Sequence, residues 1–326
     1  MKFKLILALF LSSFVLFNSC GDVSAKRSIK LAHGLDVNHS VHKAMVKMGE
    51  DLAEISEGKM QLEIYPSQQL GTERECIELL QIGSLDMTKV SVGVMENFAP
   101  KMKVFGLPFL FRDRAHSFQV LDGPIGQDLL DEGTKYWIKG LGYYDAGSRS
   151  FYTSEKAIRT PDDLKGLKIR VMNNQMAINM VNSMGGSATP LSYSELYTAI
   201  QQGVVDGAEN NPPSFVSSNH YEISKYYTLD QHSSVPDVLL IGTKYWEKLS
   251  EEEKKWVQDA ADTSAQAQKK FWNDSVEESM QIARKAGVEI IIPDKSLFAE
   301  KSKSVLEAFE KEYPEMAPIV SQIKSQ

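Results

Sequence analysis

The sequence predicts an α/β protein built from two similar lobes, and three observations support this fold class. Strand and helix patterns alternate between residues 27 and 92, and the same alternation starts again between 160 and 211. A long helical pattern covers 250–287, and no low-complexity segment separates the two units. We therefore expect the chain to cross between the lobes more than once, as in hinged proteins that hold a ligand between their lobes.

The first unit alternates strands and helices in the order β-α-β-α-β. The apolar face of the first helix carries Val41, Met45, Met48 and Leu52 at helical spacing, and Gly58 and Gly83 stand where the two helices should end. This order favours a mostly parallel sheet with helices on both faces. The predicted strands cover 27–34, 60–66 and 85–92, and the predicted helices cover 40–58 and 72–83.

The second unit repeats this design. Thr160 and Pro161 start a short turn, and Ser192 and Glu195 form a capping box at the start of a helix that ends on Gly203. The predicted elements are a strand at 167–173, a helix at 175–186 with Met176, Met180 and Met184 on one face, an extended segment at 188–191, a helix at 192–203, and a strand with a loop at 204–211.

The helical pattern at 250–287 predicts one long helix, continuous or broken. Its packed side is expected to carry Trp256, Ala260, Ser264 and Ala267. With these elements, the expected division of the chain is residues 27–147 plus 236–275 for the first lobe and 148–235 plus 276–326 for the second.

The N-terminus is typical of a secretory signal peptide, with two lysines followed by an apolar run from Leu5 to Phe17. Cys20 lies in a lipobox-like context, so residues 1–19 are the expected signal and Cys20 is the expected lipidation site. Cleavage after Ala25 by an ordinary signal peptidase is the alternative. Both routes predict export to the periplasm, with or without a membrane anchor.

Charge and composition exclude several classes of function. Removing Lys2 and Lys4 with the signal reduces the 36 basic residues to 34, against 43 acidic residues, for a net charge of −9, which does not suit a nucleic-acid-binding protein. No G-x-S-x-G, H-E-x-x-H or phosphate-binding glycine loop is present, so we expect no enzyme activity and no cofactor. Cys76 lies in a helical pattern and is expected to be a buried, inert thiol.

Polar residues gather where the predicted strands end, which is where open α/β sheets bind ligands. Arginine offers a planar fork that matches a carboxylate, and amides and carboxylates suit hydroxyl groups. The alternatives are a solvated strand face for Arg170, paired with Glu195, and a surface position for Arg149. The candidates are Arg170, Asn173, Glu209, Asn210, Asn211, Arg149 and Glu73. Together they suit a small anion with many hydroxyl groups.

Two stretches carry a resemblance to a known family. "RTPDDLKGLKIRVMNN" at 159–174 and "GGSATPLSYSELYTAIQQGVVDGAENNPPSF" at 185–215 resemble the solute receptors of tripartite ATP-independent periplasmic (TRAP) transporters of the DctP type, and the resemblance extends from Ser28 to the C-terminus. It implies a two-lobed, periplasmic-binding-protein-like fold with hinge strands, a long helix and a ligand cleft between the lobes. It also implies that Arg170 clamps a carboxylate, with Arg149 and Asn210 beside it.

The resemblance is to the members that bind hexuronates such as glucuronate and galacturonate, and it implies that membrane subunits take over the ligand. Glu73 and His33 are the implied partners of sugar hydroxyls, with His39 as an alternative to His33. Sialic acid, an aldonate or a C4-dicarboxylate are alternative ligands. A secreted lyase or hydrolase of acidic sugars that uses Glu73 or Glu209 is the alternative class of function.

Overall fold

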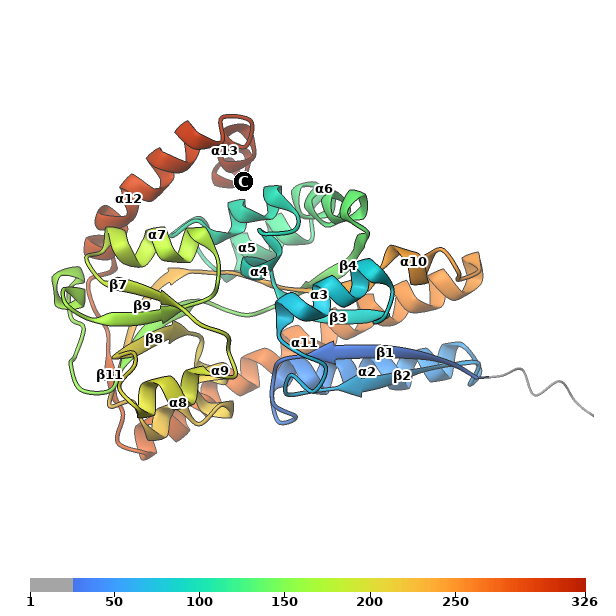
Figure 1. Ribbon diagram of the computed structural model, residues 1–326, viewed down its shortest axis with the longest axis horizontal. Coiled ribbons are helices and arrows are strands. Elements are labelled where there is room, and N and C mark those ends of the chain that lie inside the picture. Colours follow the sequence, from blue (N-terminus) through green and yellow to red (C-terminus); the bar gives the residue numbers. More distant parts are fainter. Residues whose placement is uncertain (1–25) are drawn as a thin grey trace, which may run out of the picture.

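The computed structural model describes residues 26–326 (Figure 1). The predicted signal peptide, the lipidation of Cys20 and the alternative cleavage after Ala25 lie outside these residues. The described chain forms two separate sheets of five and six strands, each packed between helices. The predicted fold class of two α/β lobes is therefore confirmed. Within residues 26–326, no helix is both long enough and apolar enough to cross a membrane.

The first sheet has the strand order β2-β1-β3-β10-β4. β1 pairs in parallel with β2 and β3, as the β-α-β-α-β pattern predicts, whereas β10 comes from much later in the chain and runs antiparallel to β3 and β4. The strands are β1 (Arg27–His33), β2 (Met60–Tyr65), β3 (Met87–Ser91), β4 (Ile138–Tyr144) and β10 (Asp237–Gly242).

The second sheet has the strand order β11-β9-β5-β8-β6-β7. β6 is parallel to β7 and β8, and β5 is antiparallel to β8 and β9. The strands are β5 (Arg149–Thr153), β6 (Lys168–Val171), β7 (Ser187–Pro190), β8 (Gly207–Asn210), β9 (Tyr226–Ser233) and β11 (Glu289–Ile291). The strand predicted within 204–211 is thus β8, and Glu209 and Asn210 belong to the strand itself, paired with Phe151 and Ser150.

The helices that follow the first strands form for the predicted reasons. The apolar face of α2 (Ser40–Ile55) is fully buried, and α3 (Glu73–Ile82) starts with a capping box and ends at Gly83 in the left-handed conformation. Two boundaries differ from the prediction. Ser56, not Gly58, caps α2. The helix α8 (Leu196–Gln201) begins only after Glu195, because the Glu195 carboxylate accepts from the Ser192 N–H and so closes a separate turn before the helix.

The remaining helices cover the faces and edges of the two sheets (Figure 1). Cys76 is buried in α3 as predicted, and burial raises the pKa of its thiol to about 11, which makes it unreactive. The helices are α4 (Val92–Met95), α5 (Arg114–Leu121), α6 (Pro124–Glu132), α7 (Gln175–Ser183), α9 (Pro212–Ser217) and α10 (Thr243–Trp246), with 3₁₀ turns η1 (Pro100–Gly106), η2 (Gly133–Tyr136), η3 (Pro161–Leu164) and η4 (His220–Glu222).

The long helix α11 (Glu251–Lys285) is continuous and lies against both lobes (Figure 1). Of the four predicted packing residues, Ala260 and Ser264 are buried, whereas Trp256 and Ala267 are only half-buried. The buried side is completed by Val257, Ala261, Gln268 and Trp272. Together with the crossings at 145–148 and 234–236, this helix ties the two lobes to each other, as expected for hinge segments.

The C-terminal helices α12 (Lys295–Glu312) and α13 (Ala317–Ser325) contact both lobes. Phe298 packs into the core of the second lobe, but Phe309, Val320 and Ile323 pack into the core of the first. The boundaries between the lobes stay a prediction, and the segment 276–326 is shared by both cores instead of belonging to one.

Gln268 joins α11 by hydrogen bonds to residues 145–148, the first segment that crosses between the lobes. Its side chain is fully buried, its Nε2 donates to the carbonyl of Asp145 at 2.7 Å, and its Oε1 accepts from the Asp145 N–H at 2.8 Å. Gln268→Ala leaves both backbone groups without partners, so we expect the free energy of unfolding to fall by about 2 kcal/mol. Urea denaturation measures this, with Gln266→Ala on the exposed side of α11 as the control. Equal losses in both variants would contradict it.

Candidate ligand-binding cleft

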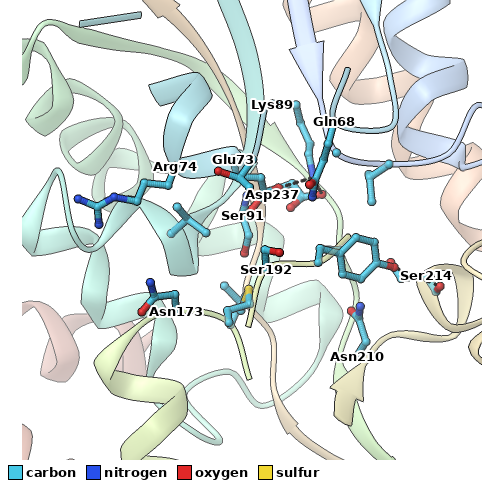
Figure 2. Close-up of a pocket in the computed structure, with 18 of the residues that line it drawn as sticks. Gln68, Glu73, Arg74, Lys89, Ser91, Asn173, Ser192, Asn210, Ser214 and Asp237 are labelled. Carbon is cyan, nitrogen blue, oxygen red and sulfur yellow. Dashed lines mark hydrogen bonds and ion pairs between the residues drawn. The ribbon is translucent and has the colours of Figure 1, made fainter. Parts of the chain in front are cut away.

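A cavity of about 190 Å³ lies between the two lobes and is lined by residues from both. This is several times the roughly 30 Å³ that one water occupies, so a small molecule has room there. Six of the eight predicted site residues line it, namely Arg170, Arg149, Asn210, Glu73, Asn173 and Asn211. Figure 2 shows side chains from the first lobe, such as Lys89 and Glu73, facing side chains of the second, such as Asn173 and Asn210.

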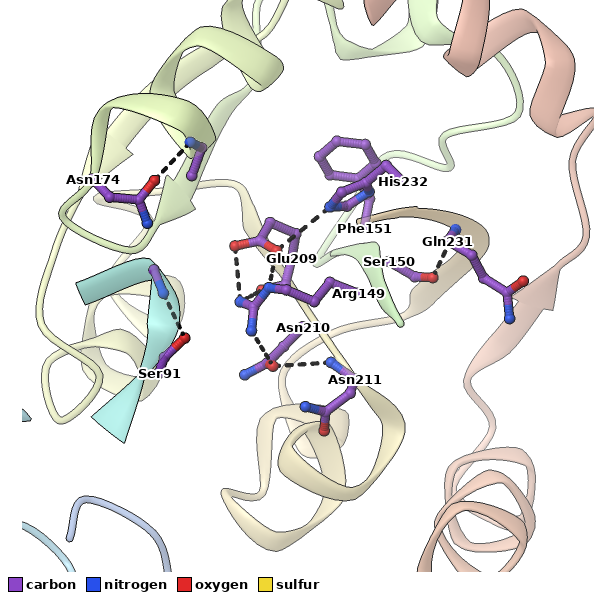
Figure 3. A network of polar contacts seen from close by, with 12 residues as sticks. Ser91, Arg149, Ser150, Phe151, Asn174, Glu209, Asn210, Asn211, Gln231 and His232 are labelled. Carbon is purple, nitrogen blue, oxygen red and sulfur yellow. Dashed lines mark hydrogen bonds and ion pairs between the residues drawn. The ribbon is translucent and has the colours of Figure 1, made fainter. Parts of the chain in front are cut away.

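Arg149 is held in place by the end of the neighbouring strand β8. Its side chain is 6% exposed, its Nη2 donates to Glu209 Oε1 at 2.9 Å and to the Glu209 carbonyl at 2.7 Å, and its Nη1 donates to Asn210 Oδ1 at 2.9 Å (Figure 3). Its Nε also donates to Glu209 Oε2. The alternative of a surface position for Arg149 is therefore wrong.

Glu209 does not line the cavity but lies behind Arg149, in a chain of buried charges. His232 contacts Glu209 Oε2 at 3.4 Å and Asp230 Oδ2 at 2.7 Å. Burial would raise the pKa of Glu209, but Arg149 and His232 lower it to about 2. Burial would lower the pKa of His232, but Asp230 and Glu209 raise it to about 9. The four groups therefore alternate in charge and sum to zero.

Arg170 has no such partner. Its side chain is 3% exposed, its Nε and Nη2 both donate to the Leu191 carbonyl at 3.0 and 2.8 Å, and its guanidinium carbon lies 5.7 Å from the centre of the Tyr193 ring. No ion pair joins it to a carboxylate within residues 26–326, and burial lowers its pKa. The predicted alternative, a solvated Arg170 paired with Glu195, is wrong. The second lobe thus presents one uncompensated positive charge to the cavity.

The first lobe places a cluster of oppositely charged side chains at the cavity. Lys89 Nζ lies 2.9 Å from Asp237 Oδ2 and 3.4 Å from Glu73 Oε1, and all three line the cavity (Figure 2). Two carboxylates share one ammonium group, so this cluster of three residues carries a net negative charge, while Arg74, which also lines the cavity, is paired with Glu78 at 3.0 Å. Glu73 was among the residues predicted from the sequence, whereas Lys89 and Asp237 were not. The available signal was a lysine inside the otherwise uncharged strand β3, the same signal that identified Arg170 in β6.

The amides add hydrogen-bonding capacity, but part of it is already used. Asn210 Oδ1 accepts from Arg149 and from the Asn211 N–H at 2.9 Å, which leaves its NH₂ group for a ligand. Asn211 Oδ1 caps α9 through the Ser214 N–H at 2.8 Å. Asn173 projects toward the cavity, and its carbonyl accepts from Asn97 of the first lobe at 3.0 Å (Figure 2).

The two candidate histidines do not line the cavity. His33 is 2% exposed, with Nε2 2.9 Å from His42 Nδ1 and Nδ1 accepting from the Leu35 N–H at 3.1 Å. Burial, aided by the charge of Lys89, lowers the pKa of His33 to about 2, so it is a neutral core residue. His39 caps α2, and burial lowers its pKa to about 3. A direct contact of His33 with ligand hydroxyls is therefore not supported by this structure.

The chain is similar to known solute-binding proteins in sequence and in structure. The model of "Bacterial extracellular solute-binding protein, family 7" (DctP) matches residues 31–312. A solute-binding protein of Chromohalobacter salexigens is 36% identical over 283 residues, which are 86% of this chain and 84% of that protein.

Two solved structures extend the comparison. A TRAP periplasmic solute-binding protein from a Sulfitobacter strain, with bound β-D-galacturonate, is 37% identical with a TM-score of 0.90 and covers 92% of this chain and 100% of its own. Another from Pseudomonas putida, with bound D-glucuronate, is 36% identical with a TM-score of 0.88 and covers 92% and 97%. With its two sheets, crossing segments and charged cleft, the chain belongs to family 7 of the bacterial extracellular solute-binding proteins, the DctP family.

Proposed function

We propose that this protein is the extracytoplasmic receptor of a TRAP transporter, and that it binds a hexuronate, glucuronate or galacturonate, for delivery to membrane subunits. The observation that carries this proposal is the opposite charge of two groups that line the cavity, Arg170 in one lobe and the Glu73, Lys89 and Asp237 cluster in the other. Arg170 presents an unpaired positive charge on one side, and Glu73, Lys89 and Asp237 together carry a net negative charge on the other.

A sugar acid fits this distribution because its charge is at one end only. Its carboxylate pairs with the fork of Arg170, which has no other anionic partner, and Arg149 and Asn210 lie along the same wall. Its hydroxyl groups donate to the carboxylates of Glu73 and Asp237, while Asn173 and Asn211 offer further polar contacts. A C4-dicarboxylate would place its second carboxylate beside the carboxylates of Glu73 and Asp237, and such like-charge contacts cost several kcal/mol.

The comparisons support this choice, since the similar proteins of Sulfitobacter and Pseudomonas putida hold galacturonate and glucuronate. Sialic acid and aldonates also carry one carboxylate and several hydroxyl groups, so they remain the alternatives that the charges alone do not separate. We choose a hexuronate because both of these similar proteins hold one.

The proposed mechanism involves binding without chemical change. The alternative of an acidic-sugar lyase or hydrolase needs a carboxyl group that exchanges protons near neutral pH. Glu209 is held ionised by Arg149, with a pKa of about 2, and does not line the cavity. Glu73 is paired with Lys89. Glu209 is therefore not placed to act on a ligand, and the carboxylate of Glu73 is engaged by the ammonium group of Lys89.

A ligand screen by thermal unfolding tests the proposal. We expect D-galacturonate and D-glucuronate to raise Tm, because ligand at 1,000 times its Kd stabilises the folded protein by about 4 kcal/mol. Succinate, and the matched neutral sugar D-galactose, should leave Tm unchanged. The NMR spectrum of the sugar should stay the same after incubation. A shift with succinate as large as that with uronates, or a converted sugar, would contradict the proposal.

Anchoring through a lipidated Cys20 is part of this proposal, with release after cleavage at Ala25 as its alternative. The mass of the mature protein from membranes distinguishes the two, because lipidation adds acyl chains to a chain that begins at Cys20.

A further inference from the structure

Two hydrogen bonds join the lobes at the edge of the cleft. Glu96, which follows α4 in the first lobe, accepts through Oε1 from the N–H of Gln175, the first residue of α7 in the second lobe, at 2.6 Å. Next to it, Asn97 Nδ2 donates to the carbonyl of Asn173 at 3.0 Å. Residues 173–175, which accept and donate these two hydrogen bonds, follow Arg170 and the end of β6 closely in the chain. They therefore connect the ligand site to this contact between the lobes.

The backbone of the first lobe approaches this segment closely. A Cβ added to Gly93 would lie 2.8 Å from Asn174 Nδ2, and one added to Gly106 would lie 2.9 Å from the Cβ of Met176. Figure 3 shows the segment that carries Ser91, at the end of β3, beside Asn174 at the start of α7. The two surfaces are thus complementary in the arrangement seen here, with the lobes together.

Glu96 supplies a cap to a helix in the other lobe. The first N–H groups of a helix have no partner within it. Asn174 bonds the Ala177 N–H at 2.7 Å, and Glu96 covers the Gln175 N–H. The Glu96 side chain is 6% exposed, and its Oε2 has no hydrogen-bond partner within the described residues. When the lobes separate, both the carboxyl group and the helix end return to water.

We propose that Glu96 is an interlobe latch that takes up a proton as the lobes close, so that the affinity of the receptor for its ligand depends on pH. The proposal rests on the proposed function in one respect, namely that a bound acid draws the lobes together. It adds a positioning residue that lies outside the ligand cavity.

The surroundings of Glu96 support this assignment. Burial raises its pKa to about 7, and the hydrogen bonds from the Gln175 and Met176 N–H groups and the charge of Lys103 offset only part of that effect. Lys103 lies on η1, and α7 presents backbone N–H groups and apolar atoms to the carboxyl group. No other charged side chain within residues 26–326 contributes to this shift.

The direction of the pH dependence follows from the linkage between proton binding by Glu96 and closure of the lobes. An acid whose pKa is higher in the closed form than in the open form favours closing at low pH, and this advantage is lost as pH rises through the closed-form value of about 7. With an ordinary pKa in the open form, we expect ligand affinity to be about tenfold weaker at pH 8 than at pH 6. The ligand carboxylate is ionised throughout this range and contributes nothing to the difference.

Calorimetric titration with D-galacturonate at pH 6, in buffers of different ionisation enthalpy, measures the proton uptake directly. We expect close to one proton per ligand for the wild type and close to none for Glu96→Gln, which keeps an oxygen acceptor for the Gln175 N–H. Glu307→Gln, an exposed position on α12, should behave as wild type. Glu96→Ala should bind about two- to tenfold more weakly than Glu96→Gln at pH 8, because it lacks the acceptor altogether.

The failures of the two proposals are distinguishable. If neither D-galacturonate nor D-glucuronate binds the wild type, the hexuronate assignment is overturned, and the same titration is made with the acid of the thermal screen that raises Tm most. Equal proton uptake by the wild type and Glu96→Gln, with whichever acid binds, overturns the latch.

Discussion

Arg170→Gln should abolish most of the affinity for uronates while leaving the ligand-free protein at least as stable as the wild type. Arg170 is buried in the cleft wall and bonded only to the Leu191 carbonyl and the face of Tyr193. Removing one partner of a buried ion pair costs about 3–5 kcal/mol, because the other charge is left unpaired. Here the ligand carboxylate would be that charge, so Kd should rise by about two to nearly four orders of magnitude.

The stability of the ligand-free variant separates this role from a structural one. Without ligand, the wild type keeps a guanidinium that has lost much of its hydration and gained no anion, so replacing it removes an unfavourable charge. Calorimetric Kd values and the ligand-free Tm measure the two effects. Lys168→Gln is a matched control, since this exposed residue lies two positions earlier in the same strand. An Arg170→Gln variant with wild-type affinity would show that the carboxylate is bound elsewhere.

Local patterns in the sequence were sufficient for most of the fold. The stripe on α2, the capping box of α3 and the left-handed Gly83 depend on neighbours within one or two turns, so they are readable from the sequence. The insertion of β10 between β3 and β4 depends on pairings between residues about 150 and about 100 positions apart, and no local signal predicts it. The return of the C-terminal helices to the first lobe was missed for the same reason.

The candidate site also combines features that can be predicted from neighbouring residues with features that depend on distant parts of the chain. Charged residues inside apolar strands identify wall positions, which is how Arg170 was found and how Lys89 could have been found. The direction of a side chain depends on the partners that surround it. Glu209 points back to Arg149 because His232 and Asp230, which follow it by more than twenty residues, complete its ion pairs. Asp237 meets Lys89 only because β10 pairs with β3.

Glu209→Gln should lower the free energy of unfolding by about 3 kcal/mol at pH 6, because it leaves Arg149 buried without its carboxylate. For a protein of this size, the expected fall in Tm is roughly 5 °C. The substitution conserves shape, so the loss reports charge and not volume. Glu155→Gln is the matched control, since its ion pair with Lys225 is on the surface, with Glu155 78% exposed, and should contribute less than about 1 kcal/mol.

The pH dependence of this loss distinguishes a charge effect from a packing defect. The pKa of Glu209 is about 2 in the folded protein, so its contribution is complete above the ordinary pKa and is lost as pH falls toward 2. The pKa of His232 is raised to about 9, partly by Glu209, so that contribution is complete below the ordinary value and is lost as pH rises through 9. The difference between wild type and Glu209→Gln should therefore be greatest near pH 6 and should narrow at both pH 3 and pH 9. Urea denaturation at these three values measures it, and a difference that stays constant with pH would mean that Glu209 supports Arg149 by its shape alone.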